Sequence, residues 1–472
     1  MSRIRESLNA LTFAGLALAL SSFAVGAETG KRLSTDYSVS VGGKTVEVVR
    51  TPKPENHIPK GLQFSYSYAH FAATGTVEVT VRSDVLWMRR TRILPDSKRI
   101  DRIGSDDRTV TFRMTPPCTV AVEPMGRHRA LILSADLPDV RPVEANGRKV
   151  RAFGPGYHRP GLISLGDNET LYLEAGAWVE GYVVGKGDNM TVCGQGVLSG
   201  APWNWGAEPE GSWKGRFVYL QGNGLQVRDV TLFSSWMWTL HLNCVTNGLV
   251  ENVKVLGGRV INDDGMDLGR VKNVVVRNSF VRCQDDCLTP KWWCDGIVCS
   301  NCTLWTEMAN AIRLGYECER KDTGHAYRNV LMRDIDILHL SLVPTRPSEY
   351  WANAAICLQP CNTQEFEAFT FERIRFGEAN PWDNFLVVKA MPVTVGHDFP
   401  EVGDFRGLTL RDISLPESHG GMGVYLDAPD PRHVIEGVRF ENVTGYGEVV
   451  RKGNVRKVDL RQPAETATKQ TP

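Results

Sequence analysis

The sequence predicts an all-β protein, with a parallel β-helix preceded by a small antiparallel β-sandwich. Three observations carry this prediction. Short alternating strand patterns, separated by Gly, Pro and Asp, occupy residues 30 to about 150. From about residue 165, stretches of strand texture repeat at intervals in the twenties. No 3.6-residue apolar period, which would indicate helices, accompanies these repeats.

The first 27 residues have the pattern of a secretory signal peptide. Arg3 and Arg5 precede an apolar run, and the small residues Val25 and Ala27 fit a cleavage site. The apolar stretch is shorter than the ~20 residues that a membrane span requires. We therefore exclude residues 1–27 from the fold and expect an exported protein, secreted or periplasmic, with no membrane span.

Residues 28–155 are predicted to form the β-sandwich. The segments "YSVSVGG", "GTVEVTVR", "TVTFRM" and "RALILSA" alternate apolar and polar residues, and turn-forming residues separate them. "RAFGPGYHRPG" is the expected connection to the second domain.

Residues 156–460 are predicted to form the β-helix, and residues 461–472 a disordered tail. An Asn or Asp recurs between two apolar alternations, and Asp229, Asn252, Asn278 and Asn301 lie 23, 26 and 23 residues apart. One such coil cannot bury its apolar face alone, so the coils must stack. A short polar side chain at a bend tolerates left-handed backbone, so this ladder is structural. Leucine-rich repeats have a similar period, but these repeats are rich in Val, Ile and Asn.

The overall charge excludes some partners. The chain has 54 basic and 54 acidic residues, which argues against nucleic acid and against a polyanion held mainly by net charge. Eleven cysteines show no zinc-ligand spacing, and either disulfides or buried free thiols fit them.

Acidic residues form two clumps in "INDDGMDLGRVKNVVVRNSFVRCQDDCLTPK". Asp285 and Asp286 follow Asp264 by 21 and 22 residues, which is close to one coil. Stacked coils lie roughly 4.8 Å apart, so the three carboxylates should cluster. Like charges that are this close push one pKa up, which yields the protonated acid and the ionised base that glycoside hydrolysis uses. A turn or a weak calcium loop is the alternative, and adjacent strand residues such as Asp285 and Asp286 would face opposite sides.

These residues resemble glycoside hydrolase family 28, the polygalacturonase-like right-handed β-helix enzymes. The family's Asn-Thr-Asp-Gly-Ile-Asp motif is similar to "NDDGMD", its Asp-Asp-Cys motif to "DDCLTPK", and its earlier histidine to His241. The resemblance implies that Asp285 is the general acid, and that Asp264 and Asp286 activate water with inversion. The positions that match the family are Asn262, Asp264, Gly265, Asp267, Asp285, Asp286, Cys287, Lys291 and His241.

Two departures point towards the related family 49, the dextranases and isopullulanases, which also carry a β-sandwich before the β-helix. Ala309 stands where family 28 has a histidine, and "NAAICLQPCN" lacks the basic residue of the uronate clamp. "IRLGYE" is similar to a run of family 49. Arg313, within that run, either touches substrate or is an ordinary surface arginine.

Aromatic residues can supply sugar-stacking surfaces. Trp203, Trp205 and Trp213 lie in one Gly- and Pro-rich loop, and Trp292 and Trp293 follow Lys291. We expect two of the five to touch sugar, and packing against the β-helix is the alternative. The predicted substrate-binding residues are Lys291, Arg313, His241, Trp292, Trp293, Asn262 and Asp267.

The sequence thus predicts an exported inverting glycoside hydrolase that acts on a polysaccharide or oligosaccharide, with a neutral α-linked glycan as the expected substrate. A pectin hydrolase, a β-helix polysaccharide lyase and a non-catalytic glycan-binding protein are the alternatives. Carboxylate acid–base chemistry requires no cofactor or metal. Insertions at 339–365 and 377–404 would favour exo action if they close one end of the groove. The oligomeric state stays open.

Overall fold

A computed structural model describes residues 31–461, apart from 145–146, 318–321, 323, 342–351, 361–363, 380–383, 391–400 and 417–420. The predicted signal peptide, nearly all of the predicted tail and parts of both long insertions lie outside the described residues. No helix in the described ranges is long and apolar enough to cross a membrane.

The N-terminal domain is a sandwich of two sheets, as predicted. Its core lies between the sheets and includes Val79, Val81, Phe112 and Leu133. One pair departs from the predicted antiparallel pattern: β11 pairs antiparallel with β10 on one side and parallel with β5 on the other. The six-stranded sheet contains β1 (Arg32–Leu33), β4 (Val48–Arg50), β5 (Ser67–Ala72), β11 (Leu131–Asp136), β10 (Cys118–Arg127) and β7 (Arg92–Leu94). The five-stranded sheet contains β3 (Lys44–Val46), β2 (Ser38–Val41), β6 (Val77–Arg82), β9 (Thr109–Met114) and β8 (Asp101–Ser105).

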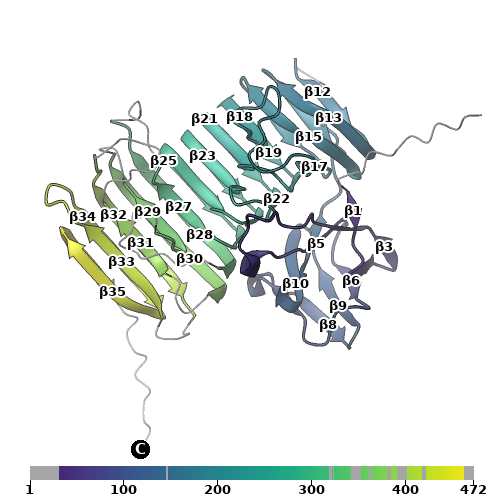
Figure 1. Cartoon of the computed structure of the whole chain (residues 1–472), viewed down its shortest axis with the longest axis horizontal. Helices are drawn as coiled ribbons and strands as arrows, with labels where there is room; N and C mark the ends of the chain where they lie inside the picture. Colours follow the sequence, from purple (N-terminus) through teal and green to yellow (C-terminus); the bar gives the residue numbers. More distant parts are fainter. Residues whose placement is uncertain are drawn as a thin grey trace, which may run out of the picture.

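The second domain is a right-handed parallel β-helix, seen in Figure 1 as a long stack of coils with the sandwich at its side. Its sheet begins at Lys149, slightly ahead of the boundary expected at 155. The first strands are β12 (Lys149–Phe153), β13 (Gly156–Leu165), β14 (Glu169–Leu173), β15 (Ala177–Lys186), β16 (Thr191–Cys193), β17 (Val197–Ser199), β18 (Val218–Asn223), β19 (Gln226–Arg228), β20 (Thr231–Phe233), β21 (Leu240–Glu251) and β22 (Lys254–Leu256). The middle strands are β23 (Met266–Arg277), β24 (Phe280–Cys283), β25 (Leu288–Ser300), β26 (Thr303–Thr306), β27 (Ile312–Gly315), β28 (Tyr327–Leu340) and β29 (Ile356–Gln359). The last strands are β30 (Phe366–Ala379), β31 (Asn384–Lys389), β32 (Phe405–Ser414), β33 (Met422–Ala428), β34 (Ile435–Thr444), β35 (Tyr446–Gly453) and β36 (Val455–Arg461).

Parallel register decides which side chains enter the core of the β-helix. Leu240 pairs with Met266, and Met266 pairs with Leu288, so a column of buried aliphatic side chains runs along the inside. Side chains alternate along a strand. The next column, which contains His241 and Asp267, therefore points away from that core. This outward column underlies the candidate site.

The predicted Asn ladder is confirmed. Asp229, Asn252, Asn278 and Asn301 all have positive φ, between 51° and 65°. Their side chains are bonded between coils: Asn252 donates to Asp229 at 2.9 Å, and Asn301 donates to Asn278 at 2.8 Å. The recurring residue thus combines left-handed backbone with a bond between coils.

The two domains meet in an apolar interface. Tyr68 and Ile132 of the sandwich pack in one cluster with Phe233, Phe280 and Trp305 of the β-helix. Buried ion pairs cross the same interface. This interface fixes the sandwich beside the coils that carry the acidic residues.

The sequence left disulfides and buried free thiols open for the cysteines, and the structure favours free thiols. The nine that the structure describes are free, and seven of them are buried.

Candidate active site

Three carboxylates meet as the coil spacing predicted. One side-chain oxygen from each of Asp264, Asp285 and Asp286 lies within 4.8 Å of the others. Asp264 and Asp286 each stand two residues before a strand, β23 and β25, and these strands pair in register. The Gly265 amide donates to the Asp286 carbonyl at 2.8 Å, which extends the pairing into the turns. Asp264 and Asp286 therefore hold equivalent places on neighbouring coils.

A turn explains how Asp285 and Asp286 both reach the cluster. Residues 284–287 lie between β24 and β25 and are not in a strand, so strict alternation of side chains does not apply. The Asp286 amide donates to Asp285 Oδ1 at 2.9 Å, and Thr306 Oγ1 donates to the Asp285 carbonyl at 2.8 Å. These bonds fix the turn with both carboxylates on one side.

Lys291 neutralises one side of the cluster. Its Nζ lies 3.2 Å from Asp264 Oδ2, 3.0 Å from Asp267 Oδ1 and 3.3 Å from Glu317 Oε1. The same ammonium lies 3.3 Å from the centre of the Trp238 ring, a cation–π contact. These carboxylates raise the pKa of Lys291 despite its burial, so the amine stays charged.

Asp286 is held by donors on the opposite side. Asn310 donates to Asp286 Oδ1 through its backbone amide at 2.8 Å and its side chain at 2.6 Å. Arg313 Nη1 lies 3.9 Å from Asp286 Oδ2, and Arg313 Nη2 donates to Gln359 at 2.6 Å. Arg313 is buried, so it is not an ordinary surface arginine.

Asp285 has no cation in direct contact among the described residues. Burial raises its pKa well above the usual range, and the charges of Asp264 and Asp286 raise it further. Burial also raises the pKa of Asp264, while Lys291 opposes that shift. The environment therefore distinguishes Asp285, whose pKa is raised and which has no cation in contact among the described residues, from Asp264 and Asp286, which are held by a cation or by donors.

The same three carboxylates could coordinate a cation, since they offer one oxygen each. Lys291 and Arg313 already place positive charge beside two of them.

Asp263, where the resembling family has Thr, has a structural role. It is fully buried and accepts bonds from the backbone amides of Gly258 and Gln284. Burial raises its pKa to about 7. It ties the turn before β23 to the turn that carries Asp285.

Three residues predicted to bind substrate are buried in this structure. His241 and Asp267 are fully buried, and Trp292 is 5% exposed. The rings of Trp213, Tyr219, Trp238 and Trp292 surround His241 with centroid separations of 5.1–5.6 Å. Burial, with Arg216 nearby, lowers the pKa of His241 well below its usual value. The lowered pKa favours a neutral imidazole, which the four rings enclose.

Trp292 is covered because its indole lies over Gly269 on the preceding coil. A Cβ at Gly269 would come within 2.2 Å of the indole. Arg270 covers the ring at 4.3 Å from its centroid. Trp293 points to a different neighbour and stacks on His325 at 4.9 Å.

Asn262 does lie at the cluster. Its side-chain amide donates to Asp285 Oδ2 at 3.5 Å, and its own carbonyl oxygen accepts from the Trp205 indole at 3.0 Å. The sequence did not predict the bond from Asn262 to Asp285. It also did not predict the two bonds from Asn310 to Asp286.

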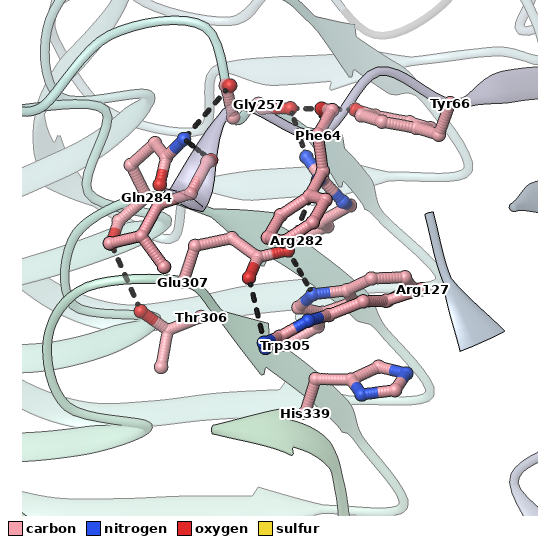
Figure 2. A network of polar contacts seen from close by, with 12 residues as sticks. Phe64, Tyr66, Arg127, Gly257, Arg282, Gln284, Trp305, Thr306, Glu307 and His339 are labelled. Atoms are coloured by element: carbon pink, nitrogen blue, oxygen red, sulfur yellow. Dashed lines mark hydrogen bonds and ion pairs between the residues drawn. The ribbon is translucent and has the colours of Figure 1, made fainter. Parts of the chain in front are cut away.

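A polar network from the domain interface supports the turn from behind (Figure 2). Arg282 donates to the Gly257 carbonyl at 2.9 Å and contacts Glu307 at 3.3 Å. Glu307 also accepts from Trp305 Nε1 at 2.8 Å and pairs with Arg127 of the sandwich at 3.3 Å. Gln284, next to Asp285, donates to the Leu62 carbonyl of the sandwich at 3.1 Å. The N-terminal domain thus braces the turn that carries Asp285.

The chain is similar to several solved structures, and the first of those named here confirms the fold. Dex49A from Penicillium minioluteum superposes with a TM-score of 0.60 over 89% of this chain and 90% of its own, at 15% identity. The family 28 exopolygalacturonase of Yersinia enterocolitica gives 0.47 over 84% and 98%, at 12% identity. An exopolygalacturonase from Thermotoga maritima gives 0.42 over 66% and 84%, at 13% identity. No family model and no curated protein matches the chain.

Proposed function

We propose that the protein is a glycoside hydrolase that cleaves an α-linked glycan by carboxylate acid–base catalysis. The observation that carries this proposal is the cluster of Asp264, Asp285 and Asp286 with side-chain oxygens within 4.8 Å. The likeness in fold to Dex49A is consistent with it.

The environment of each carboxylate suggests its role. Asp285, whose pKa is raised, donates its proton to the glycosidic oxygen as the bond breaks. Asp264 and Asp286, held by Lys291 and by Asn310 with Arg313, accept the proton of the attacking water. Acid–base catalysis of this kind typically contributes about 10²–10⁴-fold in rate.

The stereochemistry needs its own measurement. The resemblance to family 28 implies inversion, but inverting enzymes usually hold their carboxyl groups ~6.5–9.5 Å apart and retaining enzymes ~5–5.5 Å. One side-chain oxygen of each carboxylate lies within 4.8 Å of the others, so a retaining double displacement is the second candidate. The anomer formed first, followed by proton NMR, distinguishes the two mechanisms.

The contacts of Lys291 and Arg313 favour a neutral glycan as the substrate. Lys291 is 3% exposed and Arg313 2%, and both already have carboxylate or amide partners. Neither is free to bind a uronate carboxylate in this structure.

The deciding experiment compares wild type with Asp285→Asn. Reducing-end release is measured on neutral α-glucans, galactans and polygalacturonate. We expect the wild type to cleave a neutral glycan, and Asp285→Asn to lose about 10²–10⁴-fold in kcat. Asp84→Asn, at an exposed carboxylate of the sandwich, is the matched control and should keep full activity. Full activity of Asp285→Asn on the substrate that the wild type cleaves would refute the assignment.

Two further readouts separate the alternatives. A lyase would leave an unsaturated product that absorbs in the ultraviolet, whereas a hydrolase would not. Chelation by EDTA should leave activity unchanged, because we assign the chemistry to carboxylates without a metal. Export remains part of the proposal, and N-terminal sequencing of the mature protein would show cleavage after residue 27.

A further inference from the structure

A segment of the N-terminal domain reaches into the neighbourhood of the candidate active site. It runs from Thr51 to Tyr66, between β4 and β5, and lies beside β22 in Figure 1. The Glu55 amide donates to the Arg259 carbonyl at 2.9 Å, and the Glu55 carboxylate pairs with the Arg259 guanidinium. The Ile261 amide bonds to His57 Nε2 at 3.3 Å. This segment therefore holds the turn that leads to Asn262 and Asp264.

Of the five tryptophans considered from the sequence, one presents a large exposed surface. Trp205 is 42% exposed, whereas Trp292 is buried. Trp203 packs on Trp236, Trp213 stacks on Tyr219, and Trp293 stacks on His325.

Three contacts fix the orientation of Trp205. Its indole lies against the His57 ring with centroids 4.5 Å apart and planes tilted by 35°. Its indole N–H donates to Asn262 at 3.0 Å, and its backbone amide donates to Glu55 at 3.3 Å. An exposed indole that is held this firmly loses little conformational entropy when a ligand covers it.

Trp205 lies close to Asp285, the proposed proton donor, and this position indicates a function for Trp205. Asn262 connects the two, since it accepts from the indole and donates to Asp285 Oδ2 at 3.5 Å. One residue therefore separates the exposed indole from the carboxyl that would protonate the leaving group.

We propose that Trp205, oriented by His57 and Glu55 of the N-terminal domain, forms a sugar-binding subsite next to the scissile bond. A pyranose ring stacks its apolar C–H face on the exposed indole. The subsite takes a neutral sugar residue, and the N-terminal domain is part of the substrate-binding surface. This inference rests on the proposed function.

Binding to the inactive Asp285→Asn protein tests the subsite apart from turnover. The probes are neutral hexasaccharides of α-glucan and α-galactan type, titrated by calorimetry. In this background, Trp205→Ala should raise the Kd about tenfold, and His57→Ala should raise it by a smaller factor. Trp87→Ala is the matched control, because Trp87 is 61% exposed on the sandwich, and its Kd should not change.

A second variant separates stacking from positioning. Trp205→Phe keeps an aromatic face but loses the N–H bond to Asn262, so it should keep most of the affinity. Equal loss in Trp205→Phe and Trp205→Ala would overturn the proposal, because the effect would then run through Asn262. An unchanged Kd in Trp205→Ala, or binding of no hexasaccharide in the panel, would also overturn it. Retained activity of Asp285→Asn, in contrast, would refute the proposed function and leave the binding result to stand by itself.

Discussion

The protein buries charge in two places, and the two places differ in how the charges are paired. At the domain interface, Lys254 lies 2.6 Å from Asp136, which also bonds to His70 at 2.9 Å. At the candidate active site, three carboxylates lie within 4.8 Å of one another, and Asp285 has no cation in contact among the described residues. Both sets are buried or nearly so, and the signs of their neighbours differ.

Neighbouring charges give the pKa values of Asp136 and Asp285 opposite shifts. Bonds from His70 and Lys254 lower the pKa of Asp136 even though burial opposes this. Burial and two like charges raise the pKa of Asp285. Burial raises the pKa in both places, and the neighbours overcome this shift at Asp136 but add to it at Asp285. This difference supports the proposed catalytic role of the cluster, since strongly perturbed acids gather at functional sites.

Lys291→Met should have the largest effect on activity. Removing the ammonium leaves Asp264 and Asp267 buried without their cation, so Asp264 will take up a proton and stop acting as a base. We expect kcat to fall by about 10²–10⁴-fold. Steady-state kinetics on the preferred glycan measure the change in kcat. Circular dichroism shows whether the variant is folded. Activity within about threefold of wild type would show that Asp264 is not the base.

Lys254→Met should act on stability alone. It leaves Asp136 buried beside His70 and Asn252, so the free energy of unfolding should fall by about 3–5 kcal/mol. Urea denaturation measures this loss, and kcat and KM of the folded protein should match wild type. The double variant with Asp136→Leu should recover much of the stability, because no unpaired charge remains. A loss of kcat in the folded single variant would show that the interface also tunes the site.

Asp285 and Asp136 should make opposite contributions to the pH dependence of stability. The folded-state pKa of Asp285 is raised, so ionisation opposes folding and stability is lost as pH rises. Asp285→Asn should therefore be more stable than wild type at pH 7, with the difference vanishing near pH 3. The folded-state pKa of Asp136 is lowered, so Asp136→Asn should be less stable at pH 7, and the difference should shrink as pH falls.

Thermal unfolding of both variants between pH 3 and pH 8 tests this pair of signs. The rate should follow the same group, with kcat/KM falling as pH rises through the raised pKa of Asp285. Parallel pH dependences for the two variants would contradict the contrast between the two places.

The sequence predicted the parts of this contrast that depend on the repeat. A fixed interval forces coils to stack, so the β-helix, the left-handed Asn positions and the meeting of Asp264 with Asp285 and Asp286 could all be predicted. The burial of individual outward-facing side chains could not be predicted. His241 and Asp267 point outward from the core, but other side chains cover them. Contacts between the domains were also beyond prediction, since His57 and Trp205 lie far apart in the chain and no repeat relates them.

The smallest predicted effect is on stability and concerns the Asn ladder, where no buried ion pair among the described residues is involved. Asn278 combines a φ of 55° with a side-chain bond from Asn301 at 2.8 Å. Asn278→Ala should cost about 2–3 kcal/mol, from left-handed strain of roughly 1–2 kcal/mol and a lost bond of about 1 kcal/mol. Asn278→Gly removes the bond but not the backbone fit, so it should cost less. Urea denaturation of the two variants orders them. A glycine variant less stable than the alanine variant would mean that left-handed strain is not what selects the residue at this bend.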